Sequence, residues 1–282
     1  MSAGQFRPGR ASVGSSQDAD QDFMLSKWYL DCVSQEGEAC IGYAATLRWK
    51  GFDLHYSSIL VHSRLAPVWT RTSLREISTP EITGGDIRWC CTPLKVEGHW
   101  TALSQPIERD LMKTRNGMLQ WRCCQPHARS SICLDGSHQI QGFGYVEKIE
   151  LSIPPWELNI DTLRWGRFLS ESHALVWIAY DGCGDSKAHV FFNGNEIDDC
   201  SVADTGVTLD HGRISLALQE SRVLREGPLV STALSMIPGI TRLLPGKILQ
   251  THERKWLSKG GLATTGAPPH EGWAIHEVVN FT

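Results

Sequence analysis

Residues 142–147 read Gly-Phe-Gly-Tyr-Val-Glu, and the alternation after the glycines is typical of a β-strand. Successive side chains of a strand point to opposite faces, so Tyr145 and Glu147 share one face and Val146 lies on the other. A carboxylic acid beside aromatic rings can protonate an alkene. This segment is therefore also the first candidate for a functional site.

Short alternating runs of the same kind recur along the chain, each bounded by Gly, Asp, Asn, Ser or Pro. No long segment has a helical period. Many short strands at even spacing predict an all-β fold, either a sandwich or a barrel of antiparallel strands. The clearest runs are 40–49, 54–62, 173–180, 189–192, 213–218 and 273–279.

A weak internal repeat favours two equivalent halves. Residues 28–31 (Trp-Tyr-Leu-Asp) resemble residues 144–147 (Gly-Tyr-Val-Glu), and a Leu-Arg-Trp triplet follows each at the same distance from the tyrosine. Either a duplication or the residue pattern that β-strands have in common explains this similarity. The two consecutive prolines within 153–156 exclude a central strand there, which indicates a connection over the rim of a barrel. The predicted organisation is a disordered tail over 1–22, an N-terminal β domain over 23–140 and a C-terminal β domain over 141–282.

Composition narrows the possible partners. The balance of 27 basic and 31 acidic residues gives a net charge of −4, which is not the electrostatic footprint of a nucleic-acid-binding protein. Eleven tryptophans against five tyrosines favour a cavity for a large apolar ligand. The nine cysteines are an odd number and include two adjacent pairs, a spacing that fits neither a disulfide framework nor a zinc site. We expect reduced, buried thiols, with no metal and no cofactor.

The termini and known motifs exclude further classes. Residues 1–20 have no apolar central run and do not read as a secretory signal. No apolar run reaches the ~18 residues needed to cross a bilayer, so no transmembrane segment is expected and the predicted location is the cytoplasm. Dinucleotide-binding, P-loop and α/β-hydrolase motifs are missing from the sequence.

Four segments in order resemble the carotenoid 1,2-hydratases (hydroxyneurosporene synthases) and their AttH-like relatives, a lipocalin-like group that includes fungal Diels-Alderases. The resemblance implies two lipocalin-like (calycin-like) β domains packed together. The segments that carry it are Trp28–Asp31 with Glu36-Gly37, Gln120-Trp121-Arg122 with Pro126, Gly142–Glu147, and Arg164-Trp165-Gly166-Arg167.

In the hydratases, the resemblance implies, a tryptophan that follows a histidine by two residues faces a Tyr-x-Asp pair, and the acid protonates a terminal isoprenoid double bond. Trp121 and Tyr145 match two of these residues, Glu147 stands at the place of the aspartate, and Leu119 stands at the place of the histidine. The predicted catalytic residues are Glu147, Tyr145 and Trp121. The predicted ligand-binding residues are Trp28, Asp31, Trp165, Arg164 and Arg167.

Two interpretations of Glu147 stay open at this point. Burial among aromatic rings raises the pKa of a carboxyl group, which would make Glu147 a general acid for hydration, cyclisation or isomerisation of an isoprenoid or polyketide-like ligand. Alternatively, Glu147 lies at the rim in an ion pair with Arg164 or Arg167, and the protein is a non-catalytic carrier of a lipophilic small molecule or has a structural role. The sequence does not determine the oligomeric state.

Overall fold

The computed structural model describes residues 23–75, 78–182, 184–229 and 246–281. The expected tail over 1–22 lies outside the described residues. Within them the chain forms two antiparallel sheets, one of ten strands and one of nine, which confirms the all-β prediction. The helical elements described are single turns at Thr92–Leu94, Pro155–Glu157 and Asp210–Gly212, and the short helix α2 (Gly246–Gln250).

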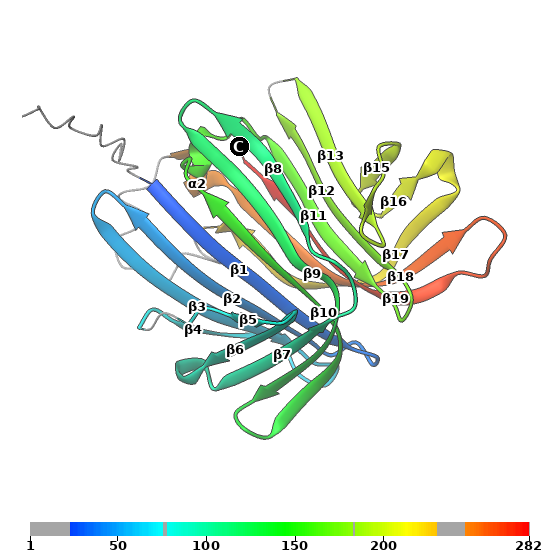
Figure 1. Cartoon of the computed structure of the whole chain (residues 1–282), viewed down its shortest axis with the longest axis horizontal. Helices are drawn as coiled ribbons and strands as arrows, with labels where there is room; N and C mark the ends of the chain where they lie inside the picture. Colours follow the sequence, from blue (N-terminus) through cyan, green and yellow to red (C-terminus); the bar gives the residue numbers. More distant parts are fainter. Residues whose placement is uncertain (1–22, 76–77, 183, 230–245, 282) are drawn as a thin grey trace, which may run out of the picture.

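The first sheet has the order β4-β3-β2-β1-β10-β9-β7-β6-β5, with β8 paired to β9 (Figure 1). Its strands are β1 (Phe23–Ser34), β2 (Ala39–Trp49), β3 (Phe52–His62), β4 (Trp69–Ser73), β5 (Glu81–Thr83), β6 (Asp86–Cys91), β7 (Val96–Ala102), β8 (Ile107–Thr114), β9 (Gly117–Leu134) and β10 (His138–Leu151).

The second sheet has the order β14-β13-β12-β11-β19-β18-β17-β16-β15. Its strands are β11 (Thr162–Leu169), β12 (Ala174–Gly182), β13 (Asp185–Phe192), β14 (Asn195–Glu196), β15 (Cys200–Ala203), β16 (Gly206–Leu209), β17 (Ile214–Pro228), β18 (His252–Thr264) and β19 (His270–Asn280). In each sheet the first strand in sequence pairs with the last, so the two halves share one topology.

The sequence repeat does not relate these halves. Both repeated segments belong to the first sheet, where β1 and β10 pair directly and Tyr29 lies opposite Glu147. The counterpart of β1 in the second sheet is β11. The expected boundary between residues 140 and 141 falls inside β10, and the chain passes from one sheet to the other between Leu151 and Thr162.

Glycines near the start of β10 mark close packing inside a continuous strand. A Cβ atom on Gly142 would lie 2.0 Å from the carbonyl oxygen of Val33, and one on Gly144 would lie 2.3 Å from the carbonyl oxygen of Asp31. The register between β9 and β10 also shifts just after Gly144, as at a β-bulge. The glycines therefore allow β1 and β10 to approach each other and do not begin a new domain.

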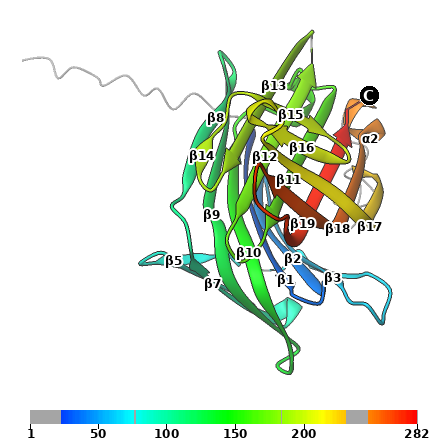
Figure 2. The same cartoon turned by 90° about the vertical axis from the view of Figure 1, so that its right-hand side faces the viewer.

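Side-chain alternation sorts the core into three clusters. In β1, Tyr29 and Val33 join the cluster that lies between the two sheets, whereas Trp28, Leu30 and Cys32 pack on the other face of the first sheet. A third cluster packs on the outer face of the second sheet. Figures 1 and 2 show the two curved sheets stacked, with the central strands of each sheet at the interface.

Candidate functional site

One row of side chains crosses the inner face of the first sheet. Strand register places Cys123 of β9 opposite Glu147 of β10, Glu147 opposite Tyr29 of β1, and Tyr29 opposite Tyr43 of β2. Directly paired residues of adjacent strands project to the same face. We refer to Cys123, Glu147, Tyr29 and Tyr43 as the first-sheet row.

A second row crosses the inner face of the second sheet. Trp165 of β11 lies opposite Glu277 of β19, Glu277 opposite Lys255 of β18, and Lys255 opposite Arg225 of β17. Lys255 and Glu277 form a buried ion pair. We refer to Trp165, Glu277, Lys255 and Arg225 as the second-sheet row.

The two rows face each other across the interface. The indole Nε1 of Trp165 donates a hydrogen bond to Oε2 of Glu147 at 3.1 Å, and the Trp165 ring lies 4.9 Å from the Tyr29 ring. The Lys255 ammonium lies 5.2 Å from the Tyr29 ring centroid and 5.7 Å from that of Tyr43, within the range of cation–π attraction. The interface therefore places ionisable groups among aromatic rings, where the sequence predicted an apolar cavity.

Glu147 supplies the carboxyl group of the first-sheet row, and only 4 % of its surface is exposed. Trp121 Nε1 and the Tyr145 hydroxyl each donate to its Oε2 at 2.6 Å, in addition to the bond from Trp165. Burial raises the pKa of Glu147, although these donors and the Lys27 ammonium oppose the shift. Because three donors converge on Oε2, the acidic proton belongs on Oε1, and the group can act as a hydrogen-bonded neutral acid.

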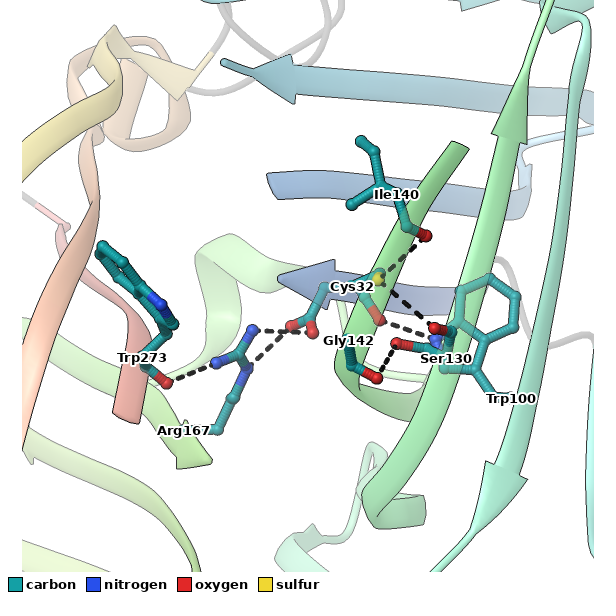
Figure 3. A network of polar contacts seen from close by, with 8 residues as sticks. Cys32, Trp100, Ser130, Ile140, Gly142, Arg167 and Trp273 are labelled. Atoms are coloured by element: carbon teal, nitrogen blue, oxygen red, sulfur yellow. Dashed lines mark hydrogen bonds and ion pairs between the residues drawn. The ribbon is translucent and has the colours of Figure 1, made fainter. Parts of the chain in front are cut away.

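A second carboxyl group, Asp31, joins the two sheets through an arginine. Arg167 of β11 donates from Nε to Asp31 Oδ2 at 3.0 Å and from Nη2 to Oδ1 at 2.8 Å, and neither side chain is exposed. Nη1 of Arg167 also donates to the carbonyl oxygen of Trp273 at 2.8 Å (Figure 3). Burial raises the pKa of Asp31, and the Arg167 charge opposes that shift.

The ion pair expected between Glu147 and an arginine is not formed. Arg167 is occupied by Asp31, and Arg164 points to the other face of β11, where it bonds Asp181 at 3.1 Å and Asp204 at 2.8 Å. The alternation of β11 explains this separation because residues 164 and 167 fall on opposite faces. The rim ion pair is thus wrong as an account of Glu147.

The structure gathers six of the eight predicted site residues. Glu147, Tyr145, Trp121 and Trp165 meet around one carboxyl oxygen, and Asp31 and Arg167 form the neighbouring ion pair. The other two residues point away. Trp28 packs on the opposite face of the first sheet, and Arg164 is partly exposed on the outer face of the second.

Sequence reasoning missed the charged residues of the second-sheet row. In β18, Lys255 is buried while its neighbour Arg254 is exposed, and two adjacent cations do not reveal which one faces the core. Leu257 could have shown that Lys255 faces the core. It lies two residues from Lys255, so the two side chains share one face of the strand, and an apolar leucine is expected to be buried. Glu277 follows His276, and their alternation does place them on opposite faces of β19.

A separate hollow lies on the first sheet. Its volume is about 470 Å³, and Arg122 and Cys124 of β9 form part of its wall. These residues alternate with Trp121 and Cys123, so the hollow is on the face opposite Glu147. Its remaining lining residues are Ile82, Gly84, Gly85, Ile87, Ala102, Leu103, Ser104, Gln105 and Pro106.

The Lys255–Glu277 pair predicts a change in acid stability. Burial alone would raise the pKa of Glu277, but the Lys255 charge holds it below its usual value. A lowered carboxyl pKa stabilises the fold above the unfolded value and loses that contribution as the pH falls through the folded value. We expect Glu277→Gln to cost about 3 kcal/mol at pH 7, because it leaves Lys255 without its partner.

Urea unfolding between pH 7 and pH 3 checks this expectation. The difference in unfolding free energy between wild type and Glu277→Gln should shrink as the pH falls below ~4.5, where the carboxylate of the unfolded chain begins to bind a proton while the folded one stays charged, and it should be lost once the pH passes the lower folded pKa. Glu220→Gln is the matched control, because Glu220 pairs with Lys259 at 3.0 Å on the exposed surface. A difference that stays constant across this range would contradict the assignment.

No helix in the described ranges is both long enough and apolar enough to span a membrane.

No protein-family model matches the chain, and no curated protein matches it in sequence. Among solved structures, the chain is similar to CghA with Sch210972, at 11 % identity and a TM-score of 0.56 over 93 % of this chain and 89 % of CghA. It is also similar to a putative AttH, NE1406, from Nitrosomonas europaea, at 13 % identity and a TM-score of 0.55 over 98 % of this chain and 99 % of that protein. The chain therefore has the lipocalin-like fold of the AttH-type proteins.

Proposed function

We propose that the chain binds a lipophilic small molecule between its two sheets and that Glu147 protonates a carbon–carbon double bond of this ligand. The observation that carries the proposal is the buried carboxyl group with three neutral donors on one oxygen. Burial keeps this group protonated more readily than an exposed carboxyl group, although the three donors oppose that shift, and no arginine pairs with it to fix its charge. The rings of Trp121, Tyr145 and Trp165 would stabilise the resulting carbocation.

The missing histidine bears on the type of reaction. Leu119 stands where the resemblance to the carotenoid 1,2-hydratases implies a histidine, and it packs as a partly buried apolar residue. Hydration requires an ordered water molecule, whereas cyclisation and isomerisation do not. An apolar residue at this place favours cyclisation or isomerisation of an isoprenoid or polyketide-like chain.

The fold is compatible with a small ligand. CghA, which shares this fold, was crystallised with Sch210972. In the present chain the rings of Tyr29 and Trp165 are in contact, so a ligand placed between the rows has to separate them. Binding should therefore change the fluorescence of Trp165.

We also propose that the protein is located in the cytoplasm, as expected from its sequence.

Native mass spectrometry of the protein purified from its own host, followed by organic extraction, tests ligand binding. We expect a lipophilic compound at one equivalent in the wild-type protein and its loss in Trp165→Ala, which removes a wall of the site. Trp69→Ala is the control, because Trp69 of β4 is 36 % exposed and outside the interface. A wild-type protein that carries no compound, and whose fluorescence does not respond to a series of isoprenoids, would contradict the proposal.

A further inference from the structure

Buried donors without an acceptor occur in both facing rows, and two of them, one from each row, are neighbours. The Tyr43 hydroxyl and Nη2 of Arg225 lack a hydrogen-bond partner within the described part of the chain. Tyr43 is 4 % exposed and the Arg225 side chain is 10 % exposed. The two groups are neighbours, because the Arg225 guanidinium carbon lies 5.2 Å from the Tyr43 ring centroid.

Buried donors of this kind are costly to leave unpaired. A hydroxyl group can also accept a hydrogen bond, but a guanidinium N–H can only donate. The group that completes the site must therefore offer an acceptor atom to Arg225. An oxygen between the two side chains would satisfy both donors.

The charges around Tyr43 favour an anionic oxygen. Three cations lie near its ring, Lys27 at 5.3 Å, Arg225 at 5.2 Å and Lys255 at 5.7 Å from the centroid. Two carboxylates pair with them, Glu277 with Lys255 and Glu253 with Arg225 at 3.6 Å. Counted over these five residues of the described chain, with Glu147 protonated as proposed above, the sum is one positive charge in excess, and a ligand with one negative charge would neutralise it.

We propose that Tyr43 and Arg225 bind an oxyanion of the ligand, such as an ionised enol, phenol or carboxylate, at one end of the site that has Glu147 at the other. This inference rests on the proposed function and narrows its substrate class to lipophilic molecules with an acidic head group. Tyr43 lies two strands away from Glu147 along the first-sheet row. At the usual strand spacing, the head group would sit about 10 Å from the acid, which sets the distance between the oxyanion and the reacting double bond.

Binding of all-trans-retinoic acid and of its methyl ester, followed by tryptophan quenching, tests the inference. The two probes share an isoprenoid chain and differ in the negative charge. Charge-assisted hydrogen bonds should make the acid bind about tenfold more tightly than the ester to the wild-type protein. Arg225→Gln should remove this preference and leave the Kd of the ester nearly unchanged.

A second variant, Tyr43→Phe, tests the inference even if Arg225→Gln does not fold. Tyr43→Phe keeps the ring and removes only the hydroxyl group, and it should reduce the preference for the acid by about threefold, as expected for one hydrogen bond. Arg254→Gln is the matched control, because Arg254 precedes Lys255 but is exposed and paired with Glu226. It should bind both probes like the wild type.

The outcomes separate the two proposals. Equal binding of acid and ester to the wild type, or a preference that survives in both variants, would overturn the oxyanion site while leaving lipophilic binding intact. The oxyanion site would also be overturned if both variants changed the binding of acid and ester equally, because water alone would then satisfy the two donors. Absence of binding by either probe would overturn the ligand site and the oxyanion site together.

Discussion

Replacing Arg167 by methionine is expected to lower the free energy of unfolding by about 3–5 kcal/mol at pH 7. The substitution leaves Asp31 fully buried without its bidentate partner, and burial of an unpaired carboxylate is strongly unfavourable. It also frees the carbonyl oxygen of Trp273, which accepts a hydrogen bond from Arg167. The pair connects β1 to β11, so its loss weakens the contact between the two sheets.

Urea unfolding monitored by tryptophan fluorescence measures the effect. Arg164→Met is the control on the same strand, since Arg164 is partly exposed and its ion pairs are on the surface; its cost should stay below about 1 kcal/mol. The double variant Arg167→Met with Asp31→Leu should recover much of the loss, because both charges are then removed. A single Arg167→Met variant as stable as the control would show that the buried pair does not hold the sheets together.

The fold was predictable where it depends on alternation. Tyr145 and Glu147 do share one face of β10 while Val146 packs on the other, because a regular strand has a period of two whatever its partner. The assignment of most of β10 to the second half was wrong because alternation does not say which strand is the neighbour. The two similar Tyr-x-acid segments suggested two equivalent halves, whereas in the structure they pair with each other in one sheet.

The candidate site was predictable where its residues are close in sequence or belong to the quoted motifs. Glu147 and Tyr145 lie on one strand, and Trp121 lies on the adjacent strand β9, close to the predicted acid. Arg225, Lys255 and Glu277 come together through the register of three strands, which local patterns do not contain. The charges of these three residues also made burial unexpected, because a charged side chain is rarely buried without a partner. The partner of each residue lies on a different strand and is distant in the sequence.

The largest effect on chemistry is expected from Glu147→Gln, which should lower turnover of the compound extracted from the host about 10²–10⁴-fold, the usual contribution of a general acid. The Kd for that compound should change little. Glutamine has almost the same shape, and its carbonyl oxygen can accept the bonds that Trp121, Tyr145 and Trp165 donate to Oε2. Its amide nitrogen carries no proton acidic enough to protonate an alkene.

The protonation state gives a readout that does not depend on the substrate. Because burial raises the pKa of Glu147, the wild-type infrared spectrum should contain the carbonyl band of a protonated carboxyl group at a pH where exposed carboxyl groups are ionised, and Glu147→Gln should lack it. A general acid works only in its protonated form, so turnover should fall as the pH rises through this pKa. A Glu147→Gln protein that binds and converts the compound at the wild-type rate would exclude Glu147 as the acid. A wild-type protein that binds the compound and releases it unchanged would instead be a carrier, in which the three donors serve only to hold a buried carboxyl group.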